Sequence, residues 1–404
     1  MRLLSLTLFL ISSMLQRYVK FEKGLPLNQN RICCMRNRIE ILDGFRAIAI
    51  LGVMFFHFFS RWTTPIHETN IYPYKQDFNF FSHGNLGVQF FFIISGFVIY
   101  FTLENTDTII VFWKKRIMRL FPSMLFASVI TYLTFIFLDH QQLFPHSHQL
   151  WNFIPSLTFI SPDLLDKFGF HSNYINGSYW SLWPEIQFYF IVSLFYFLSK
   201  RLFLINFTIF SMVVMVYSHI MINVLGTNKL QLNLPNYILE FYSNWVSGCF
   251  NLAVHLPYFF MGILFYDLFQ KKRTNVAVNK WIFSISLVMI LYVLYSNHLS
   301  VYRFLILFIL IMLFVIFIFS PKKLKFLENK IFSKIGKSSY FLYLIHENIG
   351  ILLITLFCST IFPINLFFVL LLMMALITFS IWFTNKIDFP LSNWMKKQLF
   401  SKVK

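Results

Sequence analysis

The sequence predicts an all-α polytopic membrane protein with about ten transmembrane helices and both termini in the cytoplasm. Hydrophobic residues make up 57% of its 404 residues and charged residues only 12%, about half the charged share of a soluble domain. A chain this poor in charge cannot cover a water-facing surface, so we expect lipid to be its solvent. Four apolar runs are long enough to span a bilayer or nearly so: 281–297, 304–320, 340–361 and 366–384.

The positions of the basic residues predict how the chain is threaded through the membrane. The expected spans are 43–60, 86–103, 118–138, 180–199, 202–223, 250–269, 281–297, 302–320, 340–361 and 365–385. With both ends cytoplasmic, 29 of the 34 Lys and Arg fall in inner segments or at inner helix ends, a strong positive-inside pattern. The net charge of +18 therefore indicates topology and contact with anionic membrane lipids, and we do not expect a nucleic-acid partner.

The chain divides into one membrane domain with two basic extensions. Residues 1–38 are predicted to be a cytoplasmic segment, 39–385 the transmembrane domain and 386–404 a cytoplasmic tail. The short apolar stretch 1–15 has no small-residue cleavage site after it, so a removed signal peptide is not expected. Met35 stands just ahead of the informative sequence, and translation starting there is a hypothesis.

Two ionisable residues lie in the first expected span. Arg46 and His57 are eleven positions apart, which returns the helix to within about 20° of the same face and about 16 Å further along. Ionisable side chains inside a span are functional candidates because they are costly there. The alternatives are an interfacial role for Arg46 and a structural hydrogen bond for His57. Asp43 is equally consistent with a helix N-cap.

Arg116 and Arg119 form the second candidate group, at the expected cytoplasmic start of the third span. Their spacing of three places them on the same helix face. A helix start supplies free N–H groups, and two planar guanidiniums added there would make a phosphate site. The alternative is ordinary positive-inside anchoring, which the neighbouring Lys114 and Lys115 also provide.

The remaining candidates are in two later spans. Glu185 lies in the outer half of its span, where contact with His57 is geometrically possible and would orient the imidazole as a base. A hydrogen bond from Tyr or Ser to Glu185 is the alternative. Ser339, Tyr343 and His346 make a polar stripe at helical spacing, which would either line a cofactor channel or hold helices together.

Five stretches together resemble acyltransferase family 3 of the membrane-bound O-acyltransferases. The resemblance rests on ILDGFRAIAILGVMFFH, GVQFFFIISGFVI, RIMRLFP, YWSLWPEIQFYF and SYFLYLIH. They include the first-helix arginine and histidine, the Ser-Gly-Phe of the second helix, the Arg-x-x-Arg pair and the late histidine. The resemblance covers about residues 39–385, so it would make the membrane domain an acyltransferase domain.

The resemblance implies transfer of an acyl group, usually acetyl from acetyl-CoA, to a hydroxyl of a cell-surface or exported glycan or lipid-linked saccharide. His57 would be catalytic, and Glu185 would fall in the acceptor-side pocket. Family members often carry a second acid where this chain has Ile186. The outer segments 61–85 and 139–179 are expected to shape the acceptor pocket.

The donor side is implied in the same way. Arg46, Arg116 and Arg119 would serve the phosphates or pantetheine arm of acyl-CoA, and Tyr343 and His346 would line its channel. No metal is expected, and no protein partner is predicted. The expected location is the inner (plasma) membrane of a bacterium.

The implied chemistry is a proton transfer from the acceptor hydroxyl to His57 as that hydroxyl attacks the thioester. Two other classes of protein stay open. A secondary transporter or flippase would use the same charges as a substrate path, but it favours broken helices with paired Gly or Pro, and only 13 glycines are present. A non-catalytic scaffold would not bind acyl-CoA at all.

Overall fold

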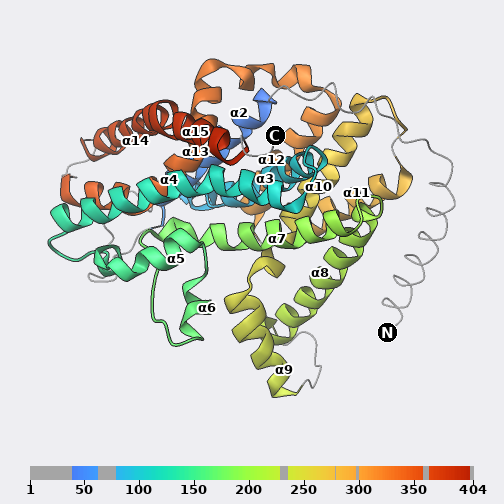
Figure 1. Ribbon diagram of the computed structural model, residues 1–404, viewed down its shortest axis with the longest axis horizontal. Helices are drawn as coiled ribbons and strands as arrows, with labels where there is room; N and C mark the ends of the chain where they lie inside the picture. Colours follow the sequence, from blue (N-terminus) through green and yellow to red (C-terminus); the bar gives the residue numbers. More distant parts are fainter. Residues whose placement is uncertain are drawn as a thin grey trace.

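The computed structural model shows a bundle of helices lying side by side (Figure 1). It describes residues 39–61, 79–227, 235–277, 279–296, 300–357 and 364–400. Every regular element within these ranges is a helix. Met35 and the whole of the predicted segment 1–38 lie outside the described residues.

Ten long helices correspond to the ten expected spans. They are α2 (Glu40–Phe59), α3 (Leu86–Glu104), α4 (Ile109–Leu138), α7 (Leu182–Leu198), α8 (Phe203–Thr227), α10 (Leu252–Arg273), α11 (Lys280–Ser296), α12 (Val301–Phe319), α13 (Lys330–Phe357) and α14 (Ile364–Phe383). In the described chain, nine helical segments are long and apolar enough to cross a membrane, and α11 is a shorter apolar helix. The protein is therefore an all-α polytopic integral membrane protein, as predicted.

Short helices connect the long ones. They are η2 (Asn79–His83), η3 (Pro145–His148), η4 (Leu150–Asn152), α5 (Phe153–Thr158), α6 (Pro162–Asp166), η5 (Gly177–Ser181), α9 (Asn236–Phe241), η6 (Tyr242–Cys249), η7 (Pro321–Glu328), η8 (Thr384–Asp388) and α15 (Phe389–Phe400). Part of the predicted tail 386–404 is thus helical: η8 continues α14, and α15 then packs against α4.

Two helix starts differ from the sequence prediction. The first helix begins at Glu40, so Asp43 is not its N-cap; Asp43 is buried inside α2 and forms an ion pair with Arg46. The helix α4 begins at Ile109, capped by the Thr108 hydroxyl, because the basic run that follows consists of good helix formers. The free N–H groups of that helix start are therefore not beside the arginine pair.

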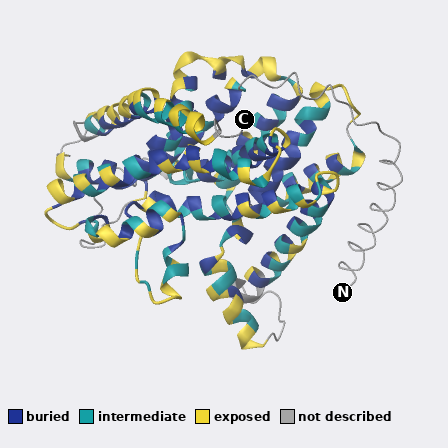
Figure 2. Ribbon diagram, in the orientation of Figure 1, coloured by how far each residue is buried: buried dark blue, intermediate teal, exposed yellow. Residues whose placement is uncertain are grey.

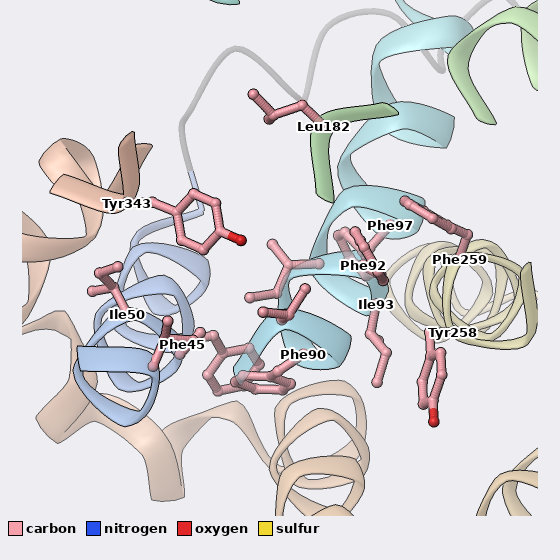
Figure 3. Packing of buried hydrophobic residues seen from close by; sticks show 14 of the residues in the cluster. Phe45, Ile50, Phe90, Phe92, Ile93, Phe97, Leu182, Tyr258, Phe259 and Tyr343 are labelled. Atoms are coloured by element: carbon pink, nitrogen blue, oxygen red, sulfur yellow. The ribbon is translucent and has the colours of Figure 1, made fainter. Parts of the chain in front are cut away.

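The core is built around α3, which lies between α2 and α10 (Figure 3). Phe92 of α3 stacks on Phe259 of α10 with ring centroids 4.5 Å apart. The two backbones approach so closely that a Cβ added to Gly96 would lie 2.0 Å from the Phe259 carbonyl oxygen. Only glycine fits there, which gives the Ser-Gly-Phe motif a packing role at the centre of the bundle.

Burial decreases from the central helices to the outer ones (Figure 2). In the α10 window 78% of residues are buried inside the protein, against 28% for the segment that includes α14. The exposed side chains of α14 are large and apolar, including Phe367, Leu371 and Trp382. Such a surface is stable only against lipid tails. Helix α14 therefore faces the lipid, whereas α3 and α10 form the interior of the helix bundle.

Helix α13 packs along α2, although the two are nearly 300 residues apart in sequence. A Cβ added to Gly336 of α13 would lie 1.8 Å from the Asp43 carbonyl oxygen of α2, so the helices touch backbone to backbone at this level. This pairing brings the late histidine His346 beside His57 of the first helix. Neither neighbour could be identified from the period of either helix alone.

Candidate active site

Five of the seven predicted site residues line one narrow pocket of about 70 Å³ inside the bundle. They are Arg46, Arg116, Arg119, Glu185 and Tyr343. We call this cavity the inner pocket. Helices α2, α3, α4, α7 and α13 all contribute to its wall, so the sequence motifs that lie far apart in the chain converge there.

The inner pocket adjoins a cleft of about 1130 Å³ that we call the basic cleft. The same side chains line both cavities where they meet: Arg46, Val98, Arg116, Arg119, Ser339 and Tyr340. The cleft adds four lysines and one carboxylate: Lys115, Lys337, Lys396, Lys397 and Asp388. Its surface is therefore strongly positive and suits an anionic ligand.

Arg116 reaches the junction of the two cavities from α4. Its guanidinium is buried, lies 5.7 Å from the ring centre of Phe112 and 5.9 Å from that of Tyr189, and donates from Nη2 to the Thr102 hydroxyl at 3.0 Å. Its Nε and Nη1 have no hydrogen-bond partner in the described chain. Buried donors are nearly always paired, so this side chain retains hydrogen-bonding capacity for an anionic ligand in the cavity.

Arg46 and Arg119 lie at the same junction as Arg116, but their surroundings differ from its buried one. Arg46 donates from Nη1 to Asp43 Oδ1 at 2.9 Å, and this i,i+3 pair orients its guanidinium. Arg119 is exposed and lines both cavities. The three guanidiniums thus combine a buried, a paired and an exposed cation at one junction.

Glu185 lines the inner pocket together with these three arginines. Its Oε1 accepts hydrogen bonds from the Ser95 hydroxyl at 2.8 Å and from the Tyr189 hydroxyl. The alternative in which Tyr or Ser bonds to Glu185 therefore holds, and the described chain shows no Glu185 contact with His57. Ser95 is the serine of the Ser-Gly-Phe motif, so the motif both packs α3 and holds this carboxylate.

His57 lies in a second group of side chains near the other end of α2. Its Nδ1 is 3.4 Å from Glu347 Oε1, and Arg61 Nη1 is 3.2 Å from the same oxygen. The ring of His346 lies 5.0 Å from that of His57, centre to centre. We call His57, Arg61, His346 and Glu347 the His57 cluster.

Glu347 was not singled out from the sequence, although a signal for it exists. It is an acid next to His346 inside an apolar span, and the rule that selected Glu185 applies equally to it. Its side chain is almost fully buried. The carboxylate beside His57 therefore comes from α13 and not from α7.

Several polar atoms of the His57 cluster lack hydrogen-bond partners in the described chain. They are His57 Nδ1, His346 Nε2 and Glu347 Oε2. His346 Nδ1 donates to the Tyr343 carbonyl at 2.8 Å, which leaves Nε2 of the neutral ring as an acceptor. Three buried atoms that form no hydrogen bond in so small a volume indicate a site for a polar group.

Tyr343 joins the two regions. It lines the inner pocket, its hydroxyl hydrogen-bonds the Ser181 hydroxyl at 2.8 Å, and its ring centre lies 5.5 Å from that of His346. Its ring extends from α13 toward α3 (Figure 3). His57 and His346 line neither cavity, so the predicted residues form two groups with Tyr343 between them.

Residues 39–385 match the sequence profile of the acyltransferase domain of acyltransferase family 3. The chain belongs to this family. No solved structure matches the chain significantly.

Two relatives of this acyltransferase-family chain come from Staphylococcus aureus. The O-acetyltransferase OatA of strain NCTC 8325 / PS 47 is 34% identical over 104 residues, which are 24% of this chain and 14% of the relative. The Putative O-acetyltransferase SACOL0978 of strain COL is 29% identical over 159 residues, which are 37% of this chain and 23% of the relative. The matched stretches thus cover less than a quarter of either relative.

The segment 139–179, which was expected on the outer side, packs against α13 beside the His57 cluster. Asn176 Nδ2 donates to the Leu344 carbonyl at 2.9 Å, and Asn348 Oδ1 accepts from the Gly177 N–H at 3.2 Å. A Cβ added to Gly177 would lie 3.0 Å from Glu347 Oε1. The end of this segment is therefore fixed on α13 directly beside the buried carboxylate. The middle of the other expected outer segment, 62–78, lies outside the described residues.

Proposed function

We propose that this protein is an O-acyltransferase that moves an acetyl group from acetyl-CoA to a hydroxyl of a cell-surface or exported glycan. It would do so in the bacterial plasma membrane, with the basic cleft on the cytoplasmic side. The observation that carries the proposal is the basic cleft that meets the inner pocket at Arg116, with Tyr343 in the pocket wall packed against His346, the neighbour of His57. The names of the relatives support acetyl as the group transferred.

The donor site follows from charge and from unpaired donors. CoA is an anion whose phosphates require cationic hydrogen-bond donors, and Nε and Nη1 of the buried Arg116 are such donors. Arg46 and Arg119 add two further guanidiniums at the same junction. The residues present therefore fit the donor, with the pantetheine arm directed into the inner pocket and the thioester at its Tyr343 end.

The His57 cluster would supply the proton transfer. In the reaction the acceptor oxygen bonds to the thioester carbonyl carbon, the carbon–sulfur bond breaks, and the hydroxyl proton passes through His57 to the CoA sulfur. His57 acts as the base and then as the acid. Glu347, 3.4 Å from His57 Nδ1, would orient the ring and stabilise its protonated form, while the outer segment on α13 would bound the acceptor's side.

The decisive experiment replaces His57 by Gln in the full chain. Glycan O-acetylation by the variant, measured by mass spectrometry in cells lacking the native gene, is expected to fall about 10²- to 10⁴-fold. Release of free CoA by purified protein given de-O-acetylated envelope glycans should fall equally. The matched control is His219→Gln, a histidine exposed on α8, which should retain full transfer.

The outcomes separate the proposal from its rivals. Retained O-acetylation by a folded His57→Gln protein would overturn the role of His57. A native protein that moves glycan or acyl intermediate without releasing free CoA would be a transporter or flippase. A native protein whose melting temperature does not respond to acetyl-CoA would be a scaffold.

A further inference from the structure

The basic cleft contains two sets of cations at different depths. Arg46, Arg116 and Arg119 line both the cleft and the inner pocket, so they stand where the two cavities meet. Lysines form the second set and line the cleft alone: Lys115, Lys337, Lys396 and Lys397. A ligand that reaches from the cleft into the inner pocket therefore has the arginines beside its part at the junction and the lysines beside its part that stays in the cleft.

The lysine set depends on the C-terminal helix α15. This helix of 12 residues packs against α4 and contributes Ser392, Asn393, Lys396 and Lys397 to the cleft wall. It lies beyond residue 385, where the match to the acyltransferase domain ends. The wall of the cleft is therefore partly built by a segment outside the family's shared domain.

The two lysines of α15 are available for a ligand. Lys396 and Lys397 are exposed and have no ion-pair partner among the described residues. Among the described residues that line the cleft, the one carboxylate is Asp388, and it accepts a hydrogen bond from the Ser123 hydroxyl at 2.9 Å. An unneutralised lysine pair at a cavity wall attracts phosphate as a pair of point charges.

We propose that Lys396 and Lys397 of α15 bind the 3′-phosphate of acetyl-CoA, while the arginines at the junction bind its pyrophosphate. The inference rests on the proposed function, because it assigns parts of the same donor. CoA carries anionic groups at two separated places, with the pyrophosphate nearer to the thioester and the 3′-phosphate on the ribose beyond it. Two sets of cations in the same order, one at the junction and one in the outer cleft, match that arrangement.

The test compares two donors in two proteins. The KM of acetyl-CoA and that of 3′-dephospho-acetyl-CoA are measured for the native full chain and for the Lys396→Gln/Lys397→Gln variant, by release of the free thiol. Loss of the 3′-phosphate contact should raise the KM of acetyl-CoA about tenfold in the variant. The KM of the dephospho donor should stay the same in both proteins, because that donor lacks the group that the lysines bind.

The matched control is the Lys322→Gln/Lys323→Gln variant, another exposed adjacent pair, on η7 outside the cleft wall. It should leave both KM values unchanged. An equal rise for both donors in the α15 variant would show a general or structural effect of the lysines, and unchanged values would show no contact; either result overturns the inference.

Three further outcomes distinguish binding of lipid headgroups, failure of the proposed function and failure of the role of α15 alone. If the α15 variant differs from the native protein only in nanodiscs that contain phosphatidylglycerol, the lysines bind lipid headgroups and the inference is wrong. If the native protein neither binds nor turns over acetyl-CoA, the proposed function itself fails. Normal turnover with no discrimination between the donors refutes only the role of α15.

Discussion

The basic cleft and the His57 cluster contrast in size, exposure and charge. The cleft measures about 1130 Å³ and is lined by seven cationic side chains and one acid, several of them exposed. The His57 cluster lies beyond the inner pocket, where two histidines and Glu347 are buried with atoms that lack partners. On the proposed function, the two regions have different roles: the many cationic side chains of the cleft bind the acyl donor, and the few buried groups of the His57 cluster carry out the proton transfer.

The division predicts two kinds of mutational effect. An exposed charge is screened and shares its role with neighbours, so its loss has a graded effect. A buried group has no substitute, and removal of one partner leaves another unpaired. Substitutions in the His57 cluster should therefore lower kcat strongly, whereas substitutions in the cleft should raise the donor's KM.

After His57 itself, the largest effect is expected at Glu347. Glu347→Gln keeps the shape of the side chain but removes the charge that lies 3.4 Å from His57 Nδ1. We expect kcat for glycan acetylation to fall about 10²-fold, with the donor's KM unchanged, as measured by release of free CoA at varied acetyl-CoA.

A matched control is available in the exposed carboxylate Glu240 of α9. Glu240→Gln should have no effect on either constant. Glu347→Gln protein with kcat within twofold of the native value would remove the carboxylate from the mechanism, and the His57 cluster would then need another orienting group.

A smaller and different effect is expected at Arg116. Arg116→Lys retains the charge but loses the planar fork and its contacts with the Phe112 and Tyr189 rings. We expect the KM of acetyl-CoA to rise about tenfold while kcat changes little. Arg201→Lys, at an exposed arginine between α7 and α8, is the control. A fall in kcat with an unchanged KM would contradict the separation between cleft and cluster.

The sequence alone predicted the positions of the long apolar helices well, because hydropathy acts over the length of each helix. All ten expected spans coincide with helices, apart from their ends. The helix ends differ more from the prediction, because α4 begins already at Ile109 and α2 at Glu40. Asp43 and Arg116 therefore lie inside their helices and not at the helix starts. The exact first residue of a helix depends on local propensity and packing over one or two positions, which a hydropathy pattern does not resolve.

The sequence prediction named seven residues of the candidate site but missed Glu347, Arg61 and the pairings between side chains. The spacing of Arg46 and His57 fixed their helix face, yet it could not show that α13 is the neighbour of α2. The carboxylate beside His57 is Glu347 for that reason, while Glu185 is held by Ser95 and Tyr189. Which helices touch depends on close contacts such as Gly336 with Asp43, and a single sequence does not reveal such pairs.

The smallest effect is expected at Tyr343, where the two regions meet. Tyr343→Phe removes only the hydroxyl that bonds Ser181, and Ser181 keeps its hydrogen bond to the Ser178 carbonyl. The ring remains in contact with His346. One hydrogen bond of this kind contributes about 1 kcal/mol, so we expect kcat and KM to stay within about threefold of the native values in the same assay.

This last variant tests the comparison most directly, because its hydroxyl belongs to the inner pocket and its ring to the His57 cluster. A small effect would show that Tyr343 is a wall along which the pantetheine arm lies, with the chemistry confined to the buried histidines and Glu347. A fall in kcat of more than tenfold would show instead that the hydroxyl takes part in the proton transfer. The two regions would then form one continuous active site, and the division between recognition and chemistry would have to be drawn at Arg116 rather than at Tyr343.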